Sequence, residues 1–127
     1  MQVANYVRLY ADEDGESHFE DVDTELQPMD FAPPAAPLNV APISAAEQCL
    51  WVGAPVGWRG DIPHPVPNRH IFCIMQGAVE ITVSDGSSRN FPVGSVVLEE
   101  DTHGKGHSSR ITSDVDLLMF AVTLADN

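Results

Sequence analysis

The sequence predicts a single all-β domain whose short strands form a barrel or a sandwich, and two observations carry this prediction. First, 127 residues are too few for two hydrophobic cores of normal size, and 43% hydrophobic with 20% charged residues is an ordinary globular balance. Second, from residue 48 onward short apolar segments alternate with glycine and proline turn signals. Only Ser44–Leu50 could be read as helical, so a helical or mixed fold is not expected.

The expected strands follow from apolar runs and from alternation. His70–Met75 is a continuous apolar run, which suits a strand buried on both faces. Ala78–Ser84 alternates apolar and polar residues, and Asp85-Gly86 directly after it is a strong hairpin turn signal. The other expected strands are Gln48–Val52, Arg89–Phe91, Val96–Leu98 and Val115–Leu124.

The first third of the chain differs from the rest in charge and in proline content. Residues 1–30 hold nine acids and one base, Arg8, which gives −8 of the net charge of −13. Two interpretations stay open for this piece: a solvated acidic arm, or an edge strand anchored by apolar residues such as Leu9. Residues 28–42 hold five of the ten prolines, so we expect an extended strap that lies over the core. Its expected anchors are Met29, Phe31, Leu38 and Val40.

We therefore predict one domain over residues 1–127, with the acidic segment and the Pro-rich strap at 1–47 and the barrel at 48–127. With Lys+Arg 6 against Asp+Glu 19, the surface would repel phosphates and anionic lipid, so we expect no nucleic-acid and no membrane partner. No apolar run approaches the roughly 20 residues of a membrane span, and no signal-peptide pattern opens the sequence. Cys49 and Cys73 lack metal-type spacing, which indicates free thiols and a cytoplasmic location.

Three of the five histidines are grouped in a way that points to one site, although a single histidine is more often a plain surface or core residue. His64 and His70 are six residues apart on a segment kept extended by three prolines, and even spacing would put both on one face of one strand. His107 follows Gly104 and Gly106, which mark a tight loop where the backbone approaches another segment closely.

The acids just before His107 are not expected to form a catalytic pair. Glu99 and Glu100 are neighbours on an extended chain, so their side chains point to opposite faces. Asp101 follows in a turn, where capping is its expected role. Arg69 is expected to point away from the site, either in an ion pair or at a subunit contact.

The stretch from Gly60 to Arg110 resembles a small cupin, a jelly-roll barrel. Gly77 fits the glycine that closes the first cupin motif, and counting back places His64 on the first histidine of that motif and His70 on its glutamate. His107 fits the histidine of the second motif. Residues 100–107 read E-D-x-x-G-K-G-H, and this pattern resembles a group of small single-domain cupins that also carry an acidic segment and a proline strap.

The resemblance implies a metal site, with two departures in this sequence. Cupins typically bind metal through three histidines and one glutamate, whereas Val66 stands here at the second histidine and His70 at the glutamate. His64, His70 and His107 would restore a three-nitrogen site for a divalent transition metal, with Fe, Mn, Ni and Zn all compatible. The alternative is a metal-free pocket in which the imidazoles hydrogen-bond one another or a ligand.

Two functions of different class follow. The first is a small metalloenzyme of the oxygenase, isomerase or lyase type that acts on a small organic molecule in the barrel cavity, with Lys105 orienting the substrate or acting as an acid. The second is a metal-free module that binds or senses a small molecule without turnover. A purely structural barrel would instead have its pocket filled by side chains. The resemblance and the length of the N-terminal segment also imply a two-fold homodimer.

Overall fold

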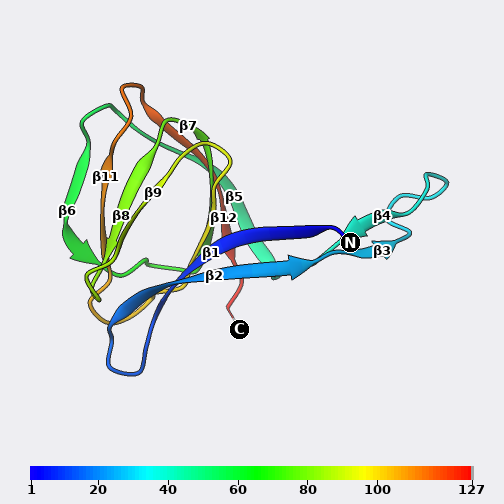
Figure 1. Cartoon of the computed structure of the whole chain (residues 1–127), viewed down its shortest axis with the longest axis horizontal. Coiled ribbons are helices and arrows are strands. Elements are labelled where there is room, and N and C mark those ends of the chain that lie inside the picture. Colours follow the sequence, from blue (N-terminus) through cyan, green and yellow to red (C-terminus); the bar gives the residue numbers. More distant parts are fainter. Residues whose placement is uncertain (127) are drawn as a thin grey trace.

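The computed structural model of the chain describes residues 1–126, and within that range every regular element is a β-strand (Figure 1). The first sheet has six strands in the order β2-β1-β10-β7-β12-β5, and the second has four in the order β6-β11-β8-β9. The bounds in the first sheet are β1 Val3–Ala11, β2 Ser17–Glu25, β5 Ala46–Ala54, β7 His70–Gln76, β10 Val96–Glu99 and β12 Leu117–Leu124. Those in the second are β6 Arg59–His64, β8 Val79–Val83, β9 Ser88–Phe91 and β11 His107–Ile111. A separate pair is formed by β3 Gln27–Met29 and β4 Leu38–Val40.

The two larger sheets face each other and enclose the hydrophobic core (Figure 1). In β8, Val79, Ile81 and Val83 are buried while the residues between them are half-buried, which is the alternation that the sequence predicts. From the other sheet, Leu9 and Ile74 are among the most fully buried side chains. The all-β prediction is confirmed, and no helix that could cross a membrane occurs in residues 1–126.

The strands predicted after residue 48 are all present, each within two residues of its expected bounds. Ser44–Leu50 is not helical, because its second half belongs to β5. The hairpin after β8 turns where expected: Gly86 has a φ of 97°, and the Val83 N–H donates to the Ser87 carbonyl at 3.0 Å.

The solvated-arm interpretation of the acidic N-terminus is wrong. β1 pairs antiparallel with β2 and parallel with β10, and Leu9 is 0% exposed. Because β2 occupies the edge, β1 is an inner strand rather than the expected edge strand. Residues 3–25 are thus built into the larger sheet, although the sequence pattern assigned them to a segment outside the barrel.

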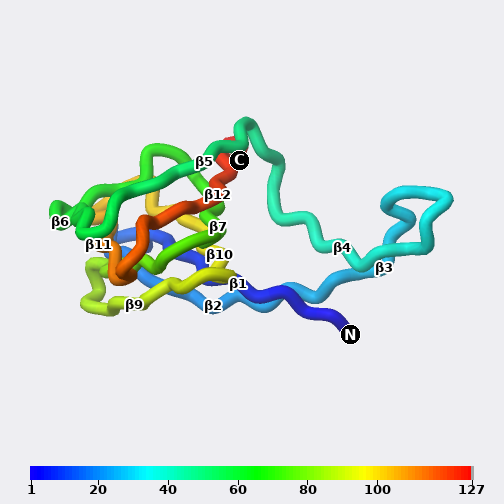
Figure 2. The backbone as a smooth tube through the Cα atoms, turned by 90° about the horizontal axis from the view of Figure 1, so that it is seen from above, coloured from blue at the N-terminus to red at the C-terminus, as the bar shows by residue number. Residues whose placement is uncertain are grey.

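The expected strap does not lie over the core. Residues 26–45, which we call the arm, contain β3 and β4 and project away from the barrel in both views (Figures 1 and 2). Met29, Phe31 and Leu38 are exposed instead of anchored, with 63% exposure at Phe31. The physical reason is that β2 runs straight past the end of the barrel into β3, so the chain leaves the sheet along its own direction.

Candidate functional site

The site is centred on His107, the first residue of β11, whose side chain is almost completely buried. Its Nδ1 lies 2.6 Å from Oδ2 of Asp101, and its Nε2 lies 3.1 Å from Oε1 of Glu99. Both carboxylates are buried as well. One imidazole is therefore held between two carboxylates in the protein interior.

Alternation at the end of β10 explains why Glu99 reaches this imidazole. Val97 is a core residue, so Glu99, two positions later, also points inward. Glu100 points outward and binds Arg8 and Arg69, which confirms the expected opposite faces and the ion pair of Arg69. Asp101 turns inward again, and its carbonyl accepts the Val66 N–H at 3.1 Å.

The electrostatics of this group follow from burial and from its hydrogen bonds. Burial alone would lower the pKa of His107, but hydrogen bonds and charge attraction from Asp101 and Glu99 raise that pKa to about 10. Burial raises the pKa of Asp101, which the His107 hydrogen bond opposes. Oδ1 of Asp101 has no hydrogen-bond partner although it is fully buried.

A tight loop brings His64 alongside His107, as the glycine pattern predicts. Gly106 has a φ of 72°, and a Cβ on it would lie closer than 3.0 Å to the His64 carbonyl, so only glycine fits there. β11 pairs with β6 at His107 and His64, and the two imidazole rings lie 5.4 Å apart. The His64 side chain is exposed, whereas that of His107 is almost completely buried.

His70 lies elsewhere than expected, because the prediction that His64 and His70 share one face of one strand is wrong. His64 ends β6 and His70 begins β7, in the opposite sheet, with a turn between them. The ring nitrogens of His70 lie 2.6 Å from the Asn68 carbonyl and 3.0 Å from Oγ1 of Thr123. His70 is nonetheless opposite Glu99 in the β7–β10 register, so its backbone lies next to the group of Glu99, Asp101 and His107, which we call the His107 group.

Among residues 1–126, the metal-ligating side chains whose donor atoms lie within 4.8 Å of one another are Glu99, Asp101 and His107. The set of His64, His70 and His107 as metal ligands stays a prediction. The sequence offered a signal for Glu99, its even spacing from an apolar residue of β10, but none for the inward turn of Asp101.

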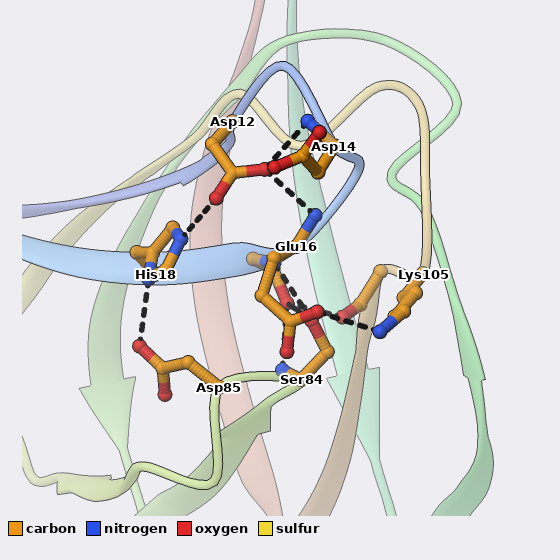
Figure 3. A network of polar contacts seen from close by, with 9 residues as sticks. Asp12, Asp14, Glu16, His18, Ser84, Asp85 and Lys105 are labelled. Carbon is orange, nitrogen blue, oxygen red and sulfur yellow. Dashed lines mark hydrogen bonds and ion pairs between the residues drawn. The ribbon is translucent and has the colours of Figure 1, made fainter.

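The loop before His107 is fixed by the turn of the β1–β2 hairpin, as Figure 3 shows. Asp12 accepts the N–H groups of Asp14 and Glu16 through Oδ1, and its Oδ2 lies 2.7 Å from Nε2 of His18. His18 also contacts Asp85 at 2.9 Å. The buried Ser17 hydroxyl donates to the Gly106 carbonyl at 2.6 Å. The acidic turn therefore holds the backbone that positions His107.

Lys105 takes part in this network and not in the His107 group. Its Nζ lies 2.6 Å from Oε2 of Glu16, and the side chain is largely exposed (Figure 3). Gly104 packs against the backbone of Gly15 so closely that a Cβ would clash. A substrate-orienting role for Lys105 stays a prediction, since the contact it makes is an ion pair with the hairpin turn.

A separate open cleft of about 510 Å³ lies away from the histidines, between β1, β2 and the turn before β10. Asp21 and Asp23 line it together with apolar residues such as Phe91. It contains no histidine and shares no residue with the group of Glu99, Asp101 and His107, so the two features are separate.

Comparison with known proteins gives matches in structure only. No protein-family model and no curated protein matches the sequence. Among solved structures, the cupin domain of Cnp3 from Schizosaccharomyces pombe matches with a TM-score of 0.51 and 17% identity over 98% of this chain and 84% of that one. A putative ethanolamine utilization protein Q from Salmonella typhimurium LT2 matches with a TM-score of 0.41 and 12% identity over 100% of both chains, too low a score to carry an argument. At 17% identity, the similarity to the Cnp3 cupin domain concerns the fold alone.

Proposed function

The chain has the cupin fold, and on that fold we propose a small metal-dependent enzyme that acts on a small organic molecule, with a divalent transition metal bound beside His107. The observation that carries this proposal is the buried group of Glu99, Asp101 and His107. Imidazole nitrogen and carboxylate oxygen are ligands that Fe, Mn, Ni and Zn accept, and Nε2 of His107 and Glu99 offer one of each.

The geometry of the group fits a metal in two respects. Asp101 holds Nδ1 of His107, as carboxylates hold metal-binding histidines, so Nε2 is the nitrogen that would face an ion. The 3.1 Å between Nε2 and Oε1 of Glu99 suits two ligands that each lie about 2.0–2.2 Å from the same ion.

Charge balance supports the same assignment. With both carboxylates ionised and His107 protonated, the buried group carries two negative charges and one positive charge. A divalent cation that replaces the Nε2 proton would make the group neutral, and an uncompensated buried charge is costly. The partnerless Oδ1 of Asp101 is a second sign that His107 alone does not satisfy the two buried carboxylates.

His64 and His70 are the proposed additional ligands, as the sequence predicts, since the His64 ring lies beside the His107 ring and His70 is paired with Glu99 in the β7–β10 register. When bound, a metal of this kind supplies a Lewis acid with open positions for substrate or water. The exposed His64 side marks the route by which a small molecule would reach it. Lys105 is a candidate acid only if its ion pair with Glu16 opens.

Metal uptake tests the proposal. Tag-free protein is stripped with chelator, incubated with Zn²⁺ or Mn²⁺, and analysed by elemental mass spectrometry and calorimetric titration. We expect one ion per chain in the wild type, and a loss of affinity of more than tenfold in Glu99→Gln and in His107→Gln. His103→Gln is the matched control, because His103 is an exposed residue of the same loop, and it should bind as the wild type does.

Wild-type protein that takes up no divalent ion would overturn the metal proposal. That result would favour the alternative, a metal-free module that binds or senses a small molecule. One observation supports this alternative: both ring nitrogens of His107 already have carboxylate partners. For either function we propose the cytoplasm as the compartment, because Cys49 and Cys73 are unpaired thiols.

A further inference from the structure

β2 lies at one edge of the larger sheet, and one row of its backbone groups faces no other strand. β1 occupies one side of β2, and no strand in residues 1–126 pairs with β2 on the other side, which we call the free edge. Such an edge can accept a further strand from another protein, because its N–H and C=O groups form a template. β2 also runs past the end of the barrel toward β3 (Figure 1).

The register shows which residues of β2 turn their backbone to the free edge. The Leu26 N–H donates to the Gln2 carbonyl at 3.0 Å, and in an antiparallel pair this bonding alternates from residue to residue. Even-numbered residues of β2 therefore bond to β1, and odd-numbered residues direct their N–H and C=O outward. Ser17 follows this rule, since its carbonyl accepts the Asp85 N–H on the free side at 3.3 Å. The outward-facing residues after it are Phe19, Asp21, Asp23 and Glu25.

The last three of these residues form a regular row of carboxylates. Because side chains alternate along a strand, Asp21, Asp23 and Glu25 share the face on which Phe19 packs against the core. All three are exposed, and successive carboxylates are about 7 Å apart along the strand. Asp21 pairs with Arg89, whereas Asp23 has no ion-pair partner among residues 1–126. The free edge thus combines unpaired backbone groups with negative charge at every second residue.

The open cleft of about 510 Å³ lies against the same face of β2. Asp21 and Asp23 line it from the strand, and Phe91 and Val93 line it from the segment before β10. In a strand added to the free edge, every second side chain would point toward this cleft. A lysine or arginine there can pack its aliphatic stem on the apolar lining and place its charged end at the carboxylates.

We propose that residues 21–25 of β2 bind an extended basic segment of a partner protein as an added antiparallel strand, with lysine or arginine at every second position. Charge selects this occupant, because the chain has a net charge of −13 and β2 holds four acids and no Lys or Arg. A second copy of β2 would set acids opposite acids, which is destabilising. The surface shares no residue with the His107 group, so it does not depend on the proposed function.

The probe is a capped peptide of alternating threonine and lysine with three lysines, because threonine favours the extended state. Its binding to the full chain is measured by calorimetric titration. We expect one peptide per chain, and an affinity that falls as NaCl is raised from about 0.05 M to about 0.5 M, since salt screens the charge pairs. The same peptide with glutamate in place of lysine should not bind.

Two double variants test the location of the binding surface. Asp23→Asn combined with Glu25→Gln removes two of the three carboxylates at the free edge and should weaken binding by about fivefold to tenfold. Glu13→Gln combined with Asp14→Asn is the matched control, because it makes the same change in net charge at two exposed residues of the β1–β2 turn. The control should bind as the wild type does, and an equal loss in both double variants would contradict the assignment to β2.

Backbone methylation of the peptide distinguishes strand addition from charge attraction alone. Methyl groups on the lysine backbone nitrogens remove the donors that would face Asp21, Asp23 and Glu25, but they keep every charge. We expect binding more than tenfold weaker, whereas methylation of the threonine nitrogens, which face away from β2, should leave the affinity nearly unchanged. The proposal is overturned if the wild type does not bind the unmodified lysine peptide, or if it binds the lysine-methylated peptide equally well.

Discussion

Replacing Gly106 by alanine should disturb the site through the backbone alone. Gly106 has a φ of 72°, and an added Cβ would lie closer than 3.0 Å to the carbonyl carbon and oxygen of His64. Those atoms belong to a paired strand, so the β11 loop and the end of β6 must separate. Gly86→Ala is the matched control, since Gly86 has a φ of 97° but nothing within 4 Å of the added Cβ.

The expected size of the effect follows from these two environments. Gly86→Ala should cost about 1–2 kcal/mol, the usual strain of a left-handed conformation for an L-residue. Gly106→Ala adds steric overpacking of about 1–3 kcal/mol to the same strain. The difference of about 2 kcal/mol corresponds to roughly 8 °C in Tm for a chain of this length.

Thermal unfolding of the two variants, followed by circular dichroism, measures this difference directly. Metal titration of the folded Gly106→Ala protein then reports on the separation of His64 from His107, and we expect weaker uptake than in Gly86→Ala. If both variants melt at the same temperature, the close approach of Gly106 to His64 does not constrain the protein.

Three further predictions concern stability. Hydrogen bonds with Asp12 and Asp85 raise the pKa of His18 above 6.5. The stability that protonated His18 contributes is therefore complete below pH 6.5 and is lost as the pH rises through the raised pKa. In melts at several pH values, the difference in Tm between wild type and His18→Gln should shrink as the pH rises through that pKa. Glu100→Gln removes the carboxylate that joins Arg8 and Arg69 and should lower the free energy of unfolding in urea by about 1–3 kcal/mol. An unchanged unfolding midpoint would show that these ion pairs do not stabilise the protein. Ile74→Ala should cost about 2–5 kcal/mol in the same assay because Ile74 is buried in the core, while the exposed Ile62→Ala should change stability by less than about 0.5 kcal/mol.

Sequence periodicity was sufficient to predict the strands that border the core. β8 and β7 were predictable because burial on one or both faces leaves a direct pattern of apolar residues. Residues 3–25 were ambiguous because the acids of β2 and of the turn between β1 and β2 mask the apolar pattern of β1, which includes the buried Leu9. Proline content indicated that the arm is extended, but it holds no information on what the arm lies against.

The candidate site was predictable only in part. The cupin-like pattern and the two glycines identified His107 and its neighbour His64. Glu99 could have been found by counting two residues from Val97, since both point inward. The inward turn of Asp101 depends on the backbone path after β10, and no local sequence signal encodes that path. The separation of His64 and His70 into different sheets arises from the turn between them, which even spacing does not reveal.

The parallel pairing of β1 with β10 affects how the chain can fold during its synthesis. Val7 pairs with Val97, so β1 leaves the ribosome about 90 residues before its inner neighbour does. The β1–β2 hairpin is complete at Glu25, about 70 residues before β10, so at about 5–20 residues per second it waits roughly 4–14 s with Leu9 uncovered. Pairings between such distant segments also slow folding in general. A nascent chain of this protein thus exposes the apolar side of β1 until β10 has been synthesised.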